Sequence, residues 1–131
     1  MTDLYRPILV DHARQPRHSR RVDRPTHQAE VVNPTCGDRA ICTLVLNGAI
    51  VSDVGISVEG CAIATAAGSV LAESILGLSL DELSSIDTSV LCHRLGAIDL
   101  PASRVDCLEL PLRAVRQALA GQRLLDRFSS A

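Results

Sequence analysis

The chain of 131 residues carries a formal net charge of −2, and 47% of its residues are hydrophobic. These values are typical of one soluble globular domain and exclude a disordered chain. Tyr5 and Phe128 are the only aromatic residues, so the core must be aliphatic and no stacking platform for single-stranded nucleic acid is available. No apolar stretch approaches the roughly 20 residues that span a bilayer, and charged residues interrupt any signal-like run. We therefore predict a single cytoplasmic domain over residues 1–131.

The first segment of the chain is rich in arginine. Its basic residues include Arg6, Arg14, Arg17, Arg20, Arg21 and Arg24. Such an arm can contact an acidic protein or nucleic acid, and a solvated segment without a specific partner explains it equally well. Because aromatic side chains are nearly absent, we do not expect nucleic acid as a partner.

Helical periodicity over residues 4–14 predicts a first helix, and residues 15–27 predict an extended connector. Strand-like runs follow at residues 40–46 and 50–58. Asn47-Gly48 lies between them and favours a tight hairpin, because both residues tolerate positive φ.

Alternate residues of the second strand share a face. The apolar face holds Ile50, Val54, Ile56 and Val58, and the polar face holds Asp53, Ser57 and Glu59. This alternation predicts a sheet with one buried side and one wet side.

Helices are predicted after the strands, at residues 62–76, 79–85, 88–95 and within 102–120. Glycines follow three of these segments and are suitable helix stops. Strands first and helices after indicate an α+β domain, in which helices cover one face of a small antiparallel sheet of about three strands.

Five cysteines, an odd number, argue against a disulfide framework and for metal or sulfur chemistry in a reducing compartment. Cys36, Cys61 and Cys107 fall at the predicted ends of elements, where side chains can converge. Gly37 lets the backbone curl so that Cys36 and Asp38 face one point. A helix N-terminus favours the thiolate, which is the form that binds metal and attacks sulfur. On spacing alone, ordinary buried cysteines remain the alternative, because no CxxC pair is present.

The position of Cys107 depends on where the last helix begins. Ser103 and Asp106 have the spacing of a capping box, which would place Cys107 in the first turn. Pro111 cannot donate to the Cys107 carbonyl, so we expect the helix to kink at Pro111 or to begin there.

Several segments resemble the U-type iron–sulfur cluster assembly family, which includes IscU, the N-terminal part of NifU, and SufU. They are Asn33-Pro34-Thr35-Cys36-Gly37-Asp38, Glu59-Gly60-Cys61-Ala62-Ile63-Ala64 and Cys107, with Leu4-Tyr5-Arg6 and Asp11-His12-Ala13-Arg14-Gln15-Pro16-Arg17 near the N-terminus. The resemblance covers nearly the whole chain and implies a SufE/NifU-like fold.

The resemblance implies that Cys36, Asp38, Cys61 and Cys107 surround a metal ion, zinc or iron, or a nascent [2Fe-2S] cluster. It also implies that these cysteines, with Cys107 as the receiving thiol, take persulfide sulfur from a cysteine desulfurase of the SufS, IscS or NifS type. Apo iron–sulfur proteins would be the recipients. Such a protein is a scaffold, a sulfur acceptor or a zinc-dependent sulfurtransferase, and not a classical enzyme. Three thiolates and one carboxylate can close a tetrahedral zinc site, in which the carboxylate is the most readily exchanged ligand.

Two features differ from IscU-like members. Asp106 stands where those proteins have a histidine before the third cysteine, and Leu100-Pro101-Ala102-Ser103-Arg104 replaces their chaperone-binding Leu-Pro-Pro-Val-Lys. The missing histidine and the Glu59-Gly60-Cys61 segment are more similar to SufU. The stretch Leu78–Leu100 is nevertheless shorter than the corresponding part of typical SufU members.

Two other functions are considered. The main alternative is a structural zinc module without sulfur transfer, and the other is a hydrolase with a cysteine nucleophile. A hydrolase needs a base, and no histidine is adjacent in sequence to Cys36, Cys61 or Cys107. Cys42 shares strand parity with core residues and Cys92-His93 lies in a short apolar helix, so we do not expect either to bind metal.

Overall fold

The computed structural model describes residues 7–96, 100 and 102–121. Its elements follow in the order α1 (Pro7–Arg14), β1 (His27–Val32), β2 (Arg39–Asn47), β3 (Ile50–Glu59), α2 (Ala62–Ile75), α3 (Leu80–Leu83), α4 (Thr88–Arg94) and α5 (Ala102–Ala120). The predicted elements are confirmed in kind and order, although the start of the helix predicted over residues 4–14 lies outside the described residues. No helix in the described ranges is long and apolar enough to cross a membrane.

The three strands form one antiparallel sheet in the order β1-β2-β3. A tight hairpin joins β2 to β3, in which Asn47 pairs with Ile50 and Gly48 has a φ of 63°. The two loop residues are therefore Gly48 and Ala49, and Asn47 is the last residue of β2. The predicted hairpin is confirmed, but Gly48 alone adopts the positive φ that residues with a side chain rarely adopt.

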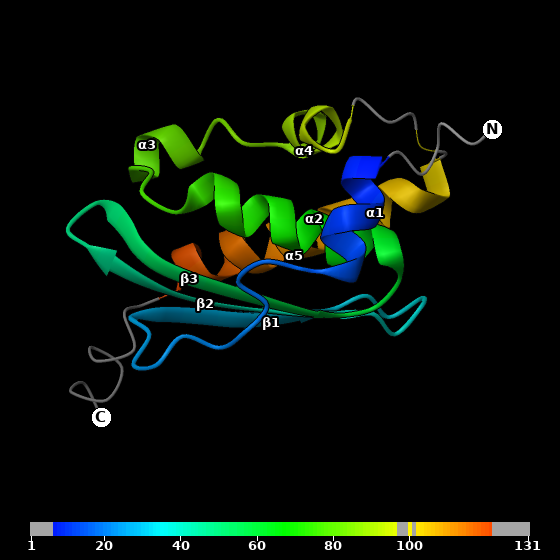
Figure 1. The fold of residues 1–131 in the computed structure, drawn as a ribbon. Helices are drawn as coiled ribbons and strands as arrows, with labels where there is room; N and C mark the ends of the chain where they lie inside the picture. Colours follow the sequence, from blue (N-terminus) through cyan, green and yellow to red (C-terminus); the bar gives the residue numbers. More distant parts are fainter. Residues whose placement is uncertain (1–6, 97–99, 101, 122–131) are drawn as a thin grey trace.

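Helices cover one face of this sheet (Figure 1). α2 packs on β3, α5 packs on β1 and β2, and the two helices pack on each other. The core between these layers is aliphatic and includes Leu44, Ile56, Leu71 and Leu108. Cys42 is fully buried in it, as its strand parity predicted. The predicted α+β fold, with helices on one face of a three-stranded sheet, is confirmed.

Small residues allow α2 to lie very close to β3. A Cβ at Gly68 would lie 2.9 Å from Cγ2 of Val58, so a larger residue would push the helix from the sheet. α2 ends at Ile75, and Gly77 follows with a φ of 87°. This glycine is the predicted helix stop.

The side of the sheet predicted for the β3 side chains is wrong at the first residue, Ile50. The pairing with β2 shifts register between Val45 and Leu46, which leaves Ser52 as the extra residue of a β-bulge. A bulge inserts one residue and reverses the alternation of faces. As a result Val51 is fully buried, whereas Ile50 is 42% exposed. The apolar residues after the bulge keep their predicted face.

The outer face of the sheet is less open than predicted, because the connector between α1 and β1 crosses it. Val22 of this connector is buried, and its N–H donates to Thr43 Oγ1 at 2.8 Å. A Cβ at Gly55 would lie 2.0 Å from the Arg20 carbonyl oxygen, so the crossing requires glycine there. Arg20 also forms a 2.8 Å ion pair with Asp53. The backbone of the connector is therefore packed on the fold, whereas Arg20, Arg21 and Arg24 stay exposed.

Of the two outcomes predicted at Pro111, a helix that begins there is wrong. The helix extends over Ala102–Ala120 with Pro111 inside it. Ser103 therefore lies in the first turn instead of capping it, and Cys107 lies in the second turn. Leucines on either side of Pro111 are fully buried. The two leucines together contribute about 3–6 kcal/mol by burial, which offsets the cost of about 3 kcal/mol for a proline within a helix.

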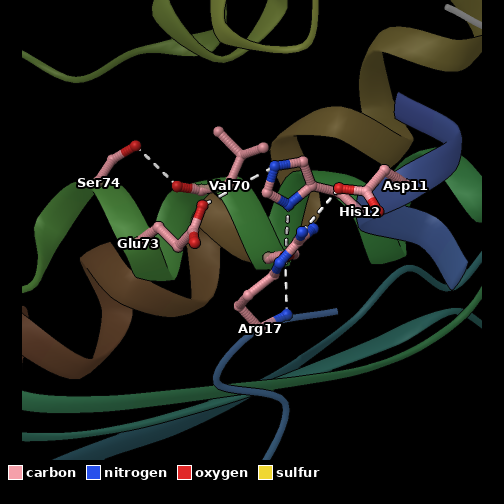
Figure 2. A network of polar contacts seen from close by, with 7 residues as sticks. Asp11, His12, Arg17, Val70, Glu73 and Ser74 are labelled. Atoms are coloured by element: carbon pink, nitrogen blue, oxygen red, sulfur yellow. Dashed lines mark hydrogen bonds and ion pairs between the residues drawn. The ribbon is translucent and has the colours of Figure 1, made fainter. Parts of the chain in front are cut away.

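A polar cluster ties α1 and the connector to α2 (Figure 2). Ser69 on α2 is only 1% exposed; His12 Nδ1 lies 2.7 Å from its Oγ, and the Arg17 N–H donates to the same atom at 2.8 Å. His12 Nε2 lies 3.8 Å from Glu73 Oε1, and Arg17 pairs with Asp11 at 2.6 Å. Burial lowers the pKa of His12, as does the charge of Arg17, while Glu73 and Asp11 oppose this shift.

Acidification should weaken this polar cluster. Because the folded-state pKa of His12 lies below its ordinary value of 6.5, the stability that neutral His12 contributes is complete above that value. It is lost as the pH falls through the lowered pKa. We expect the melting temperature to fall more steeply from about pH 7 to about pH 5 in the native protein than in His12→Gln. Replacing one buried hydrogen bond should itself cost about 1 kcal/mol. Circular dichroism melts across this range measure both effects, and parallel curves would contradict the assignment.

Candidate metal centre

A hydrogen-bonded turn joins β1 to β2 and carries Cys36 and Asp38. The Thr35 N–H donates to Asn33 Oδ1 at 3.0 Å, and the Gly37 N–H donates to the Asn33 carbonyl at 2.7 Å. The Asn33 N–H in turn donates to the Asp38 carbonyl at 2.8 Å. Gly37 has a φ of 79°. A residue with a side chain adopts this conformation only at a cost, so the turn depends on glycine at this position.

The carboxylate of Asp38 lies against the start of α2. Cys61 is the N-cap of α2, but its side chain makes no capping hydrogen bond. Its N–H instead donates to Asp38 Oδ2 at 3.4 Å, a long bond that supplies part of the missing cap. A Cβ at Gly60 would lie 2.7 Å from both Cγ and Oδ2 of Asp38. Asp38 therefore reaches α2 because residue 60 has no side chain.

Cys107 completes a cluster with Asp38 and Cys61. The two Sγ atoms and a carboxylate oxygen of Asp38 all lie within 4.8 Å of one another. Asp38 and Cys61 are half-buried, and Cys107 is 8% exposed. These side chains come from the β1–β2 turn, the start of α2 and the second turn of α5, so the tertiary fold brings them together.

Cys36 lies outside this cluster of three. It is exposed, and it borders an open cavity of about 340 Å³ together with Cys107. The residues that line this cavity are Asn33, Thr35, Cys36, Arg104, Asp106 and Cys107. The structure thus brings three of the four predicted ligands together and places the fourth at the border of an adjoining cavity. Metal binding by any of the four stays a prediction.

The two most buried thiols differ from an ordinary cysteine in their pKa. Burial raises the pKa of Cys42 to about 12. Burial is also the main reason why the pKa of Cys107 is raised to about 11; a hydrogen bond with Cys61 and the charges of Cys61 and Asp38 add to this, and a hydrogen bond from Arg104 opposes it. Even with Arg104 beside it, Cys107 is therefore a thiol at neutral pH unless a metal cation is bound next to its sulfur.

Arg104 is a site residue that the sequence did not single out. It lies one turn before Cys107 on α5, borders the same cavity and donates a hydrogen bond to the Cys107 thiol. Arg104 precedes Cys107 by three residues, and this spacing could have identified it, because residues three apart share a helix face. The capping role predicted for Asp106 is wrong, since Asp106 lies inside α5, where it is exposed and 3.9 Å from Arg113.

The donor atoms of the cluster suit a zinc ion. In a tetrahedral site with Zn–S bonds of about 2.3 Å and Zn–O bonds of about 2.1 Å, neighbouring ligand atoms lie about 3.3–3.8 Å apart. The observed separations of up to 4.8 Å close with small side-chain movements. Thiolates with a carboxylate also fit iron. The chemistry of the donors therefore fits both predicted metals.

The sequence profile of the NifU-like N terminal domain matches residues 4–123. The chain belongs to this family. One relative, the zinc-dependent sulfurtransferase SufU of Bacillus subtilis (strain 168), is 31% identical over an alignment that covers 89% of this chain and 90% of that protein. The iron–sulfur cluster assembly scaffold protein IscU 1 of Archaeoglobus fulgidus is 27% identical over 116 residues, covering 88% of this chain and 74% of that protein.

A solved structure has the same NifU-like fold. It is the N-terminal part of a nitrogen-fixing NifU-like protein from Brucella abortus, with a TM-score of 0.79 and 19% identity. The comparison covers 90% of this chain and 93% of that one. The predicted family and the predicted NifU-like architecture are both confirmed.

In the metal-free NifU-like protein at about pH 8, iodoacetamide should label Cys36 much faster than Cys107. The pKa of Cys107 is raised from an ordinary 9.0 to about 11, so Cys107 carries about 100-fold less thiolate than a cysteine with the ordinary pKa. Cys107 is also buried, whereas Cys36 is exposed. Timed labelling followed by peptide mass spectrometry measures the two rates, with buried Cys42 as the slow control. Equal rates for Cys36 and Cys107 would contradict this geometry.

Proposed function

We propose that this NifU-like protein binds a metal ion at Asp38, Cys61 and Cys107, with Cys36 as a further ligand, and uses the site to assemble iron–sulfur clusters. The observation that carries the proposal is the convergence of two thiols and one carboxylate within 4.8 Å. Similarity to a zinc-dependent sulfurtransferase and to a cluster assembly scaffold supports the same function.

The ligands differ in how firmly the fold holds them. Bound zinc or iron supplies the positive charge that stabilises thiolates. Cys61 and Cys107 offer soft donors from helices packed in the core, whereas Asp38 offers a harder oxygen donor that exchanges more readily. Cys36 lies on an exposed turn and borders the cavity beside Cys107, so movement of that turn toward α5 would bring its sulfur to the fourth position. Exchange at Asp38 or Cys36 would then open the site without unfolding it.

Cys107 is assigned as the thiol that receives sulfur from a cysteine desulfurase. Its thiolate attacks the outer sulfur of the desulfurase persulfide, the bond between the two persulfide sulfurs breaks, and the desulfurase thiolate leaves. Arg104, which donates a hydrogen bond to Cys107, would then lie beside the new persulfide anion. Cys36 is the second candidate, because it borders the same cavity and is exposed to an approaching partner.

Two modes of action are compatible with this site. In both, the protein would act in the reducing cytoplasm and apo iron–sulfur proteins would be the recipients. As a scaffold it would hold a transient [2Fe-2S] cluster, and as a sulfurtransferase it would keep zinc bound while sulfur passes through. Anaerobic incubation with iron and sulfide separates the two, because only a scaffold develops a stable visible chromophore. A structural zinc module remains the alternative function.

The metal proposal predicts that Asp38→Ala and Cys61→Ser lower zinc affinity, whereas Asp106→Ala does not. Asp106 is the matched control because its carboxylate borders the neighbouring cavity but is not part of the cluster. Gly60→Ala should lower the affinity about 10–100-fold, because the new Cβ displaces Asp38. Competition with a chromophoric chelator measures each affinity. Unchanged zinc affinity in Cys61→Ser would contradict the site.

The sulfur proposal predicts that zinc-loaded protein gains one sulfur atom on Cys107 after incubation with a cysteine desulfurase and cysteine. Peptide mass spectrometry under non-reducing conditions locates it. Cys107→Ala should lose at least about 90% of the label, the loss expected for removal of the nucleophile. Label on Cys36 alone would favour the second candidate. Label on neither thiol, in protein that retains zinc, would favour the structural module.

A further inference from the structure

Cys61 and Cys107 form a thiol pair of their own within the cluster. Their Sγ atoms lie within 4.8 Å of each other. A disulfide needs an S–S distance of about 2 Å, so the sulfurs must approach by less than about 3 Å. The Cys61 side chain makes no capping hydrogen bond, so turning its Sγ toward α5 breaks no cap of α2.

We propose that Cys61 and Cys107 are an oxidation site of the metal-free protein, at which a peroxide joins them in a disulfide that closes the metal centre. The proposal rests on the proximity of the two thiols. It stands whether or not the protein transfers sulfur, and it adds redox control to the proposed function.

The reaction has two balanced steps. The Cys61 thiolate attacks one oxygen of hydrogen peroxide, which gives a sulfenic acid at Cys61 and releases hydroxide. The Cys107 sulfur then attacks the Cys61 sulfur, the S–O bond breaks, and water leaves once the thiol proton has been transferred. In total two thiols lose two electrons and two protons, and one peroxide is reduced to two waters. Cys61 reacts first because it is half-buried, whereas Cys107 is 8% exposed.

The remaining described cysteines are less suitable partners for Cys107. Cys42 is enclosed in the core on β2. Cys36 borders a cavity with Cys107 but is not part of the group within 4.8 Å. Cys92 lies in α4, outside that group. A Cys61–Cys107 disulfide would remove two of the three donors of the cluster and leave only Asp38. Of the proposed ligands only Asp38 and Cys36 would remain, so oxidised protein would bind the metal much more weakly until a reductant cleaves the bond.

The test uses the full chain, freed of metal with a chelator and treated with hydrogen peroxide. Free thiols should fall from five to three, non-reducing peptide maps should show Cys61 linked to Cys107, and dithiothreitol should restore all five. Cys36→Ser should keep the cross-link, whereas Cys61→Ser and Cys107→Ser should both lose it. Circular dichroism of each variant confirms that the variant is folded.

Other products would overturn the proposal. A Cys36–Cys107 disulfide, a link between two chains, or sulfinic acid at Cys61 without a cross-link would each do so. Preloading with zinc tests the proposed function separately, because bound thiolates should be protected. A cross-link that forms equally fast with and without zinc would support the oxidation site and count against the metal centre. Zinc binding without any cross-link would support the metal centre and count against the oxidation site.

Discussion

The approach of the Asp38 carboxylate to the backbone of Gly60 is the contact on which the site depends. It brings an oxygen donor from the β1–β2 turn to the N-terminus of α2, where Cys61 contributes an N–H and a sulfur. Glycine at position 60 makes this contact sterically possible, and Gly37 gives the turn its shape. Two residues without side chains thus determine where the chemically active side chains lie. The packing of α2 on α5 then adds Cys107 from a part of the chain that is remote in sequence.

Much of this arrangement could be predicted from local sequence signals. The hairpin at Gly48 and the stop of α2 at Gly77 follow from backbone angles that favour glycine. The errors arose where tertiary packing competes with a local rule. At Ile50 a bulge reversed the strand alternation, and at Pro111 the burial of neighbouring leucines kept a helix continuous through a proline. The convergence of Asp38, Cys61 and Cys107 followed only from the resemblance to known proteins, because spacing along the chain does not give the distance between residues of different elements.

The three thiols near the site form a series from exposed to buried. Cys36 is exposed, Cys61 is intermediate and Cys107 is buried with a raised pKa. A negative charge on the Cys107 sulfur is therefore costly unless a metal cation is bound beside it. The Cys36 sulfur is on the surface, where a partner protein can reach it. Such a series separates the two demands on a sulfur-handling site, since a partner needs access to a thiol and a bound ion needs protection from water. Under the proposed function, one fold meets both demands because Cys36 lies on a turn and Cys107 lies on a core helix.

The connector and α1 differ from the rest of the fold in how little apolar surface they bury. Leu9 and Val22 are the only buried hydrophobic residues among residues 7–26, and much of the remaining attachment is polar, as in the contacts of Arg17 with Ser69 and of Val22 with Thr43. Segments with few buried apolar contacts open at a lower free energy than the core. The N-terminal segment is accordingly expected to open first, as a separate cooperative unit. Its opening would uncover Ser69 and the outer face around Gly55 while the hairpin and the α2–α5 pair remain folded.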